Sequence, residues 1–141
     1  MTFRSFIDTS VLVRLFDDDE PVFQAAARSL IGDSESSDLV VSASCLAAFY
    51  DIVTNRLIRP LPDVTARRAL TELSDLTVVY LDSDLVLAAT DIANADGLAL
   101  RDALAVQAAI TASCDQLVTE TLPHGAVISD VLVQNLTYWK I

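Results

Sequence analysis

The residues of this sequence best suited to chemistry are two aspartates that lie far apart in the chain. Asp8 directly follows the short apolar run Phe3–Ile7, and Asp102 lies in the segment Leu100–Leu104. An aspartate at the end of a buried strand is costly unless it is paired, hydrogen-bonded or bound to a cation. Two carboxylates that folding brings about 4 Å apart repel by about 4 kcal/mol at an effective dielectric constant of 20. This layout suggests an acidic metal site that folding assembles.

A pair of carboxylates is enough for one weakly bound Mg²⁺, because water and a substrate phosphate complete the octahedron of that ion. Simpler roles stay open for both residues: Asp102 can be a favourable charge at a helix N-terminus, and Asp8 a turn residue at a strand end. Ser10 and Thr119 are placed to orient a metal-bound water or a carboxylate, or to act as turn and cap hydroxyls.

Short apolar runs that alternate with amphipathic segments must position these residues. We expect strands at Phe3–Ile7, Leu39–Val41, Thr77–Leu81, Gln116–Thr119, Ala126–Ile128 and Val131–Leu136. We expect helices at Val11–Phe16, Gln24–Ile31, about 43–57, Asp63–Leu73, about 84–95 and Leu100–Ser113. The expected helix caps are Thr9-Ser10, Ser42 and Ser83-Asp84. Alternating strands and helices predict an α/β fold with a parallel sheet, in which functional groups gather at the carboxyl ends of the strands.

The composition limits the classes of partner. A chain of 141 residues predicts a single domain over residues 1–141. The net charge of −11 opposes nonspecific nucleic-acid binding, so an RNA substrate would need a local basic rim, a divalent cation or a basic partner protein. Candidates for a rim, which otherwise pair with neighbouring acids, are Arg14, Arg56, Arg59, Arg67, Arg68 and Arg101.

Two further features concern compartment and redox state. Arg4 and Asp8 interrupt what would be the apolar part of a signal peptide, and the longest uncharged stretches are 12 residues, too short for a bilayer. We therefore expect a cytoplasmic protein without membrane association. Cys45 and Cys114 lie in apolar helical patterns without metal-ligand spacing, which predicts reduced core residues.

Four segments in a fixed order carry a resemblance to a known family. They are Phe6-Ile7-Asp8-Thr9-Ser10-Val11-Leu12-Val13, the helix from Val41-Ser42-Ala43 to Phe49-Tyr50-Asp51-Ile52-Val53-Thr54, Leu100-Arg101-Asp102-Ala103-Leu104, and Leu117-Val118-Thr119-Glu120-Thr121-Leu122-Pro123-His124-Gly125. Together these segments resemble a PIN domain of the VapC-like kind. The resemblance implies a three-layer α/β/α fold with a central, mainly parallel sheet. It also implies an Mg²⁺- or Mn²⁺-dependent endoribonuclease, often a toxin that a small antitoxin neutralises, and a homodimer.

The resemblance carries over residue by residue only in part. Asp8 matches the first acidic ligand, and Asp102 matches the acid at the start of the later helix. Ala48 stands where the family usually has a glutamate, and Thr121 stands where it often has a second acid. The resemblance therefore implies that Asp8 and Asp102 are the metal ligands and catalytic residues of a half-empty site.

Neighbouring side chains are candidates to compensate for the missing acids. Asp51 lies one turn beyond the alanine, and Glu120 adjoins the threonine. One hypothesis is a metal-dependent endoribonuclease with impaired activity, in which Arg14 and Arg101 contact RNA phosphates. The alternative is a catalytically silent PIN-like module that binds RNA or a protein, or a protein that only dimerises.

Overall fold

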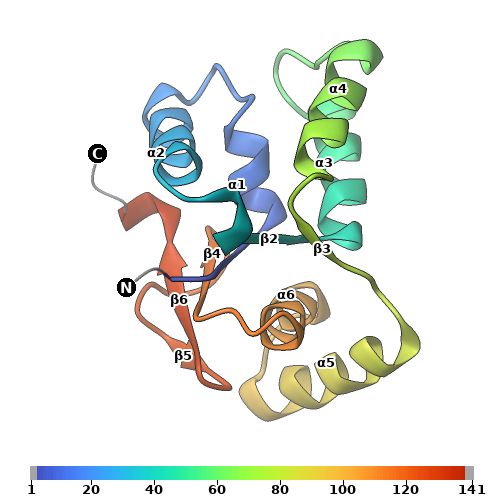
Figure 1. Ribbon diagram of the computed structural model, residues 1–141, viewed down its shortest axis with the longest axis vertical. Coiled ribbons are helices and arrows are strands. Elements are labelled where there is room, and N and C mark those ends of the chain that lie inside the picture. Colours follow the sequence, from blue (N-terminus) through green and yellow to red (C-terminus); the bar gives the residue numbers. More distant parts are fainter. Residues whose placement is uncertain (1–2, 139–141) are drawn as a thin grey trace.

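The fold is built on a six-stranded sheet with the order β3-β2-β1-β4-β6-β5. The computed structural model describes residues 3–138 (Figure 1). The strands are β1 (Ser5–Ile7), β2 (Leu39–Ser42), β3 (Thr77–Val79), β4 (Gln116–Thr119), β5 (Val127–Ile128) and β6 (Val131–Asn135). Neighbouring strands are parallel except β5, which pairs with β6 in the antiparallel direction.

Helices cover both faces of this sheet. They are α1 (Thr9–Arg14), α2 (Pro21–Gly32), α3 (Ala43–Asn55), α4 (Asp63–Leu73), α5 (Ser83–Asp96) and α6 (Leu100–Thr111), with short 3-10 turns η1 (Ser36–Asp38) and η2 (Leu136–Tyr138). Figure 1 shows α1 to α4 on one face and α5 and α6 on the other. On that second face α6 packs against β1, β2 and β4, and α5 packs against α6. The predicted three-layer α/β/α fold with a mainly parallel sheet is confirmed.

The central strands are buried on both faces. Phe6, Ile7, Val40, Leu117 and Val118 are completely inaccessible to solvent. A strand covered on both sides has no polar face, which explains the continuous apolar runs in the sequence. Polar side chains are therefore expected at the strand ends rather than along the strands.

The neighbours β1 and β4 mark the position where the strand order reverses. The chain runs outward from β1 through β2 to β3, returns through α5 and α6, and enters β4 on the other side of β1. Connections at such a position leave the sheet toward opposite faces, which opens a crevice at the carboxyl ends of the two strands. Ligands of open α/β sheets bind in this crevice.

The helix caps differ in part from the prediction. Ser42 caps α3 as expected, since its side chain accepts a hydrogen bond from the Cys45 N–H group. The expected caps Thr9-Ser10 and Ser83-Asp84 are wrong, because Asp8 is the N-cap residue of α1 and Asp82 is that of α5. Asp, Ser and Thr are all favourable N-cap residues, so a run of them leaves the first helical residue undetermined.

Two predictions about the wider chain can be compared with the structure. Cys45 and Cys114 are free and buried, as predicted. Among the described residues no helix has the length and apolar character needed to cross a membrane.

Candidate acidic site

The register of β1 and β4 places Asp8 beside Thr119. Ile7 pairs with Val118, and the backbone N–H group of Asp8 donates to the carbonyl oxygen of Val118 at 3.0 Å. The hydroxyl group of Thr119 donates to Asp8 Oδ2 at 2.8 Å. Asp8 is only 7% exposed, so this hydrogen bond lowers the cost of burying its carboxylate.

Two threonines join this carboxylate to that of Asp102. The backbone N–H group of Thr121 donates to Thr119 Oγ1 at 3.2 Å, and Thr121 Oγ1 donates to Asp102 Oδ1 at 2.7 Å. Asp102 lies in the first turn of α6, but the N-cap residue of that helix is Ala99. The structure thus brings Asp8 and Asp102 into one hydrogen-bond network through Thr119 and Thr121.

The local roles left open for the two aspartates account for little of this geometry. Asp8 is the N-cap residue of α1, yet its side chain makes no capping hydrogen bond to that helix. The hydrogen bond to Asp102 Oδ1 comes from the loop after β4 and not from α6. Both carboxylates are therefore engaged across the crevice.

Ser10 and Thr119 hold the Asp8 carboxylate in place. Ser10 Oγ donates to Asp8 Oδ2 at 3.1 Å and accepts a hydrogen bond from the Glu120 N–H group at 3.0 Å. The same hydroxyl therefore connects α1 to the loop that follows β4. Orientation of a metal-bound water by Ser10 or Thr119 stays a prediction.

Cys45 is a component of the site that the sequence reasoning treated as core. Its Sγ lies 3.9 Å from Asp8 Oδ1, within reach of a weak S–H hydrogen bond. Burial and, to a smaller extent, the negative charge of Asp8 raise the pKa of the Cys45 thiol, so it stays protonated at neutral pH. One feature of the sequence could have indicated this position. Cys45 follows the helix cap Ser42 by three residues, and Ser42 ends β2, the strand that neighbours β1.

A pocket of about 430 Å³ opens beside the Asp8 carboxylate. Its lining comes from the ends of β1 and β2 with the residues that follow them, one face of α3, the start of α6 and the loop after β4. The lining residues are Asp8, Thr9, Ser10, Ser42, Ser44, Cys45, Ala48, Asp51, Ile52, Arg56, Leu100, Arg101, Leu104, Ala105 and Thr121. The positions Ala48 and Thr121, where the resemblance expects acids, thus border one cavity together with Asp8.

Arg14 and Glu120 bind one another. Arg14 Nε and Nη2 donate to Glu120 Oε2 and Oε1 at 2.8 and 3.0 Å. Arg14 Nη1 donates to Asp17 Oδ2 at 3.0 Å. The hydrogen bond to Glu120 raises the pKa of Arg14, and the guanidinium also lies 4.9 Å from the centre of the Phe23 ring. Contact of Arg14 with a substrate, and of Glu120 with an ion, stay predictions that would require these pairs to open.

Asp51 and Arg101 line the pocket, as does Arg56. Asp51 Oδ1 accepts a hydrogen bond from Asn55 Nδ2 at 3.1 Å, and its Oδ2 lies 3.5 Å from Arg56 Nη2. The Asp51 side chain is 55% exposed, so water screens this ion pair. A supporting role of Asp51 toward an ion and a substrate-binding role of Arg101 stay predictions.

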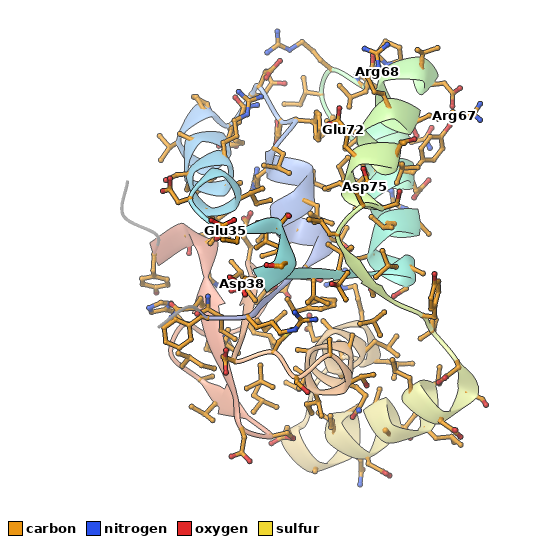
Figure 2. The ribbon with its side chains drawn as sticks, in the orientation of Figure 1. Glu35, Asp38, Arg67, Arg68, Glu72 and Asp75 are labelled. Carbon is orange, nitrogen blue, oxygen red and sulfur yellow. The ribbon has the colours of Figure 1, made fainter. Side chains whose placement is uncertain are left out.

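The other arginines proposed for a basic rim lie elsewhere. Arg59 Nη2 pairs with Asp19 Oδ1 at 3.0 Å. Figure 2 shows Arg67 and Arg68 on α4 with Glu72 on the same helix, far in the view from α6. None of these arginines lines the pocket beside Asp8. The local cationic groups of the pocket are therefore Arg56 and Arg101.

The donor set limits the site to a single divalent ion. Within residues 3–138 no three His, Cys, Asp or Glu side chains form a cluster that could hold a metal. Mg²⁺ commonly binds through one or two carboxylates and takes water and substrate oxygens for its other positions. Asp8 lines the open pocket, whereas Asp102 is joined to Asp8 through Thr119 and Thr121 without being one of the lining residues. Binding of one ion by both carboxylates therefore stays a prediction.

Fold and site together define a mainly parallel α/β protein with paired acidic groups at the crevice where its strand order reverses. The family model of the PIN domain matches residues 5–120. The chain belongs to the PIN domain family.

Solved structures agree with this assignment at the level of the fold. A chain of a toxin-antitoxin complex from Klebsiella pneumoniae matches with a TM-score of 0.70 and 16% identity, over 91% of this chain and 95% of that chain. The sarcin-ricin loop cleaving toxin VapC20 of Mycobacterium tuberculosis matches with a TM-score of 0.60 and 16% identity, over 80% and 86%. A chain of VapBC2 from Rickettsia felis, bound to a DNA fragment from its promoter, matches with a TM-score of 0.63 and 16% identity, over 93% and 97%. No curated protein matches the sequence significantly.

Proposed function

We propose that this PIN domain, as one unit spanning residues 1–141, is a VapC-like endoribonuclease of the toxin-antitoxin class with reduced activity. The observation that carries the proposal is the hydrogen-bond network from Asp8 through Thr119 and Thr121 to Asp102, of which Asp8 and Thr121 line an open pocket. The likeness of the fold to VapC20, a toxin that cleaves the sarcin-ricin loop, supports RNA as the substrate.

The acidic residues would hold one Mg²⁺ or Mn²⁺ ion. Asp8 and Asp102 supply its carboxylate ligands, and a bound ion would activate water and neutralise charge that develops on the phosphate oxygens. Ser10 and Thr119 fix the Asp8 carboxylate by donating hydrogen bonds to its Oδ2. Arg101 at the pocket would bind an RNA phosphate, a role that its five donors suit.

Reduced activity follows from the residues at the remaining positions. Ala48 contributes no ligand, and Thr121 contributes a hydroxyl that already donates to Asp102. With two carboxylates the site should bind one ion weakly and no second ion. The same Thr121 hydrogen bond favours a second candidate, a catalytically silent PIN module that binds RNA or a protein, because it satisfies Asp102 without any cation.

Several partners belong to this proposal. A small antitoxin protein would bind the chain. The similarity of the fold to chains of the toxin-antitoxin complex from Klebsiella pneumoniae and of VapBC2 from Rickettsia felis supports this partner. A homodimer and a cytoplasmic location are part of the same proposal, since they accompany the toxin class that the sequence resembles.

Cleavage of RNA during a titration with MgCl₂ or MnCl₂ tests the proposal. The wild-type protein should cleave only with the ion, and Asp8→Asn should abolish cleavage while keeping the fold, because the amide oxygen can still accept from Thr119. Asp84→Asn is the matched control, since Asp84 is an exposed acid in the first turn of α5. Equal cleavage by wild type and Asp8→Asn would contradict the proposal. RNA or peptide binding without any ion-dependent cleavage would support the silent module instead.

A further inference from the structure

Glu120 lies between the two threonines that hold the carboxylates of the acidic site. Thr119 donates to Asp8 Oδ2 at 2.8 Å, and Thr121 donates to Asp102 Oδ1 at 2.7 Å. Both oxygens of the Glu120 carboxylate accept hydrogen bonds from an arginine of α1. The backbone at this one residue therefore links the two hydroxyl groups that orient the carboxylates of the site.

The loop after β4 is attached to α1 at two points through Glu120. Its backbone N–H group donates to Ser10 Oγ at 3.0 Å, and its carboxylate accepts from Arg14 Nε and Nη2 at 2.8 and 3.0 Å. Ser10 and Arg14 are four residues apart, so both lie on one face of α1. Since α1 begins directly after Asp8, the two attachments fix the loop relative to the helix that follows this carboxylate.

The ion pair between Arg14 and Glu120 is shielded and restrained. Its two side chains are only 23% and 12% exposed, and two charge-assisted hydrogen bonds join the planar guanidinium to the carboxylate. A third hydrogen bond to Asp17 at 3.0 Å and the ring of Phe23, whose centre lies 4.9 Å away, restrain the guanidinium further. Exposed ion pairs are screened by water and contribute little, but this pair is largely shielded and held on three sides.

We infer that Arg14 and Glu120 are positioning residues of the acidic site. Their ion pair holds the loop after β4 against α1 and so keeps the two threonine hydroxyls where they orient the carboxylates of Asp8 and Asp102. This inference rests on the proposed function, because the oriented carboxylates would bind the proposed ion. Groups that hold the ligands of a metal ion in place typically change its affinity about 10–100-fold when they are removed.

Two variants weaken the ion pair with little change in the size of the side chain. Glu120→Gln leaves one oxygen that can accept from Arg14, and Arg14→Lys keeps the charge but loses the planar fork. Because the pair acts as a unit, the double variant should differ little from either single variant, and effects that simply add would overturn the inference. Arg4→Gln is the matched control, since Arg4 Nε and Nη1 also donate at 2.8 Å, to the carbonyl oxygens of Ala112 and Ser37, but at the amino end of β1.

Amide hydrogen exchange in EDTA measures the hold on the loop without ion or RNA. The N–H groups of Glu120 and Thr121 donate to Ser10 Oγ and Thr119 Oγ1, so their exchange reports directly on the loop. In both pair variants these two amides should exchange about tenfold or more faster relative to the amide of Leu132, which is bonded to the amino end of β4. Arg4→Gln should leave this ratio unchanged. Equal acceleration of all three amides by the pair variants would indicate general destabilisation and would overturn the inference.

The carboxylate carbons of Asp8 and Asp102 provide a spectroscopic signature of their orientation, also in EDTA. Both pair variants should shift these carbon-13 NMR signals, because the hydrogen bonds from the threonine hydroxyls change, and Arg4→Gln should not. Faster amide exchange with unchanged carboxylate signals would show that the pair holds the loop without positioning the site, and would overturn the inference.

Calorimetric titration with MnCl₂ separates this inference from the proposed function. Both pair variants should weaken the Kd of the full chain about tenfold or more, and Arg4→Gln should not. Arg14→Lys leaves the net charge unchanged, so its effect cannot come from charge alone. An unchanged Kd in the pair variants would overturn the inference. A wild-type protein that binds no Mn²⁺ would contradict the proposed function, and the exchange and carbon-13 results would still decide the inference.

Discussion

A glutamate at position 48 would add a third carboxylate to the acidic site, so Ala48→Glu should strengthen divalent-ion binding. Ala48 is half-buried in the wall of a pocket of about 430 Å³ that Asp8 also lines, which gives the longer side chain room. The pocket is open, so a water-like dielectric constant applies. Two unit charges about 4 Å apart then interact by about 1 kcal/mol. For a divalent ion the gain is about 2 kcal/mol, or about thirtyfold in Kd.

Calorimetric titration with MnCl₂ measures this change directly. Ala47→Glu is the control, because it adds the same charge to the exposed neighbour that lines a different hollow. Salt screens charges that lie beyond about 8 Å at physiological ionic strength, so the control should change Kd by no more than about threefold. Equal strengthening by both variants would show that net charge alone attracts the ion. Unchanged binding by Ala48→Glu would show that the pocket beside Asp8 is not where the ion binds.

Three further predictions concern stability. Thr119→Val removes the 2.8 Å hydrogen bond to the buried Asp8 carboxylate and should lower the free energy of unfolding by about 1–3 kcal/mol in urea titrations. Burial raises the pKa of Cys114 to about 11 from its ordinary 9.0, so the folded state keeps a proton that the unfolded chain loses. The free energy of unfolding should therefore fall as the pH rises from 9 to 11, and Cys114→Ala, compared over the same range, should lack this part of the fall. Gly97→Ala should destabilise by about 1–2 kcal/mol because Gly97 ends α5 at φ 65°, whereas Gly32→Ala, where the added Cβ likewise meets no atom within 4 Å, should not destabilise measurably.

The arrangement of the fold could be predicted because local patterns and sheet topology agree. Apolar runs such as Leu39–Val41 and Gln116–Thr119 correspond to the buried strands β2 and β4. Edge strands were less predictable: the expected strand Thr77–Leu81 ends at Val79, because the exposed Tyr80 and Leu81 already lead into α5. Strand length at an edge depends on pairing with one neighbour only, and this information is not local.

The acidic site could be predicted in its position but not in its bonding. Asp8 and Asp102 come into one hydrogen-bond network because one follows β1 and the other lies in the first turn of the helix that packs on it. The ion pair between Arg14 and Glu120 joins residues 106 positions apart, and charge patterns within a helix could not reveal it. The network through Thr121 was also inaccessible, since a hydroxyl in a loop has no periodicity that marks its partner.

Ion binding at this site would compete with hydrogen bonds that the folded chain already makes. Thr119 and Thr121 donate to Asp8 Oδ2 and Asp102 Oδ1, and hydrogen bonds to a charged acceptor contribute about 1.5–3 kcal/mol each. An ion that takes one of these oxygens gains electrostatic attraction and weakens a bond to a hydroxyl. The threonines therefore stabilise the ion-free fold and lower the affinity for an ion. Because the carboxylates are satisfied without a cation, loss of cleavage in EDTA would reflect the chemistry of the site and not unfolding of the domain.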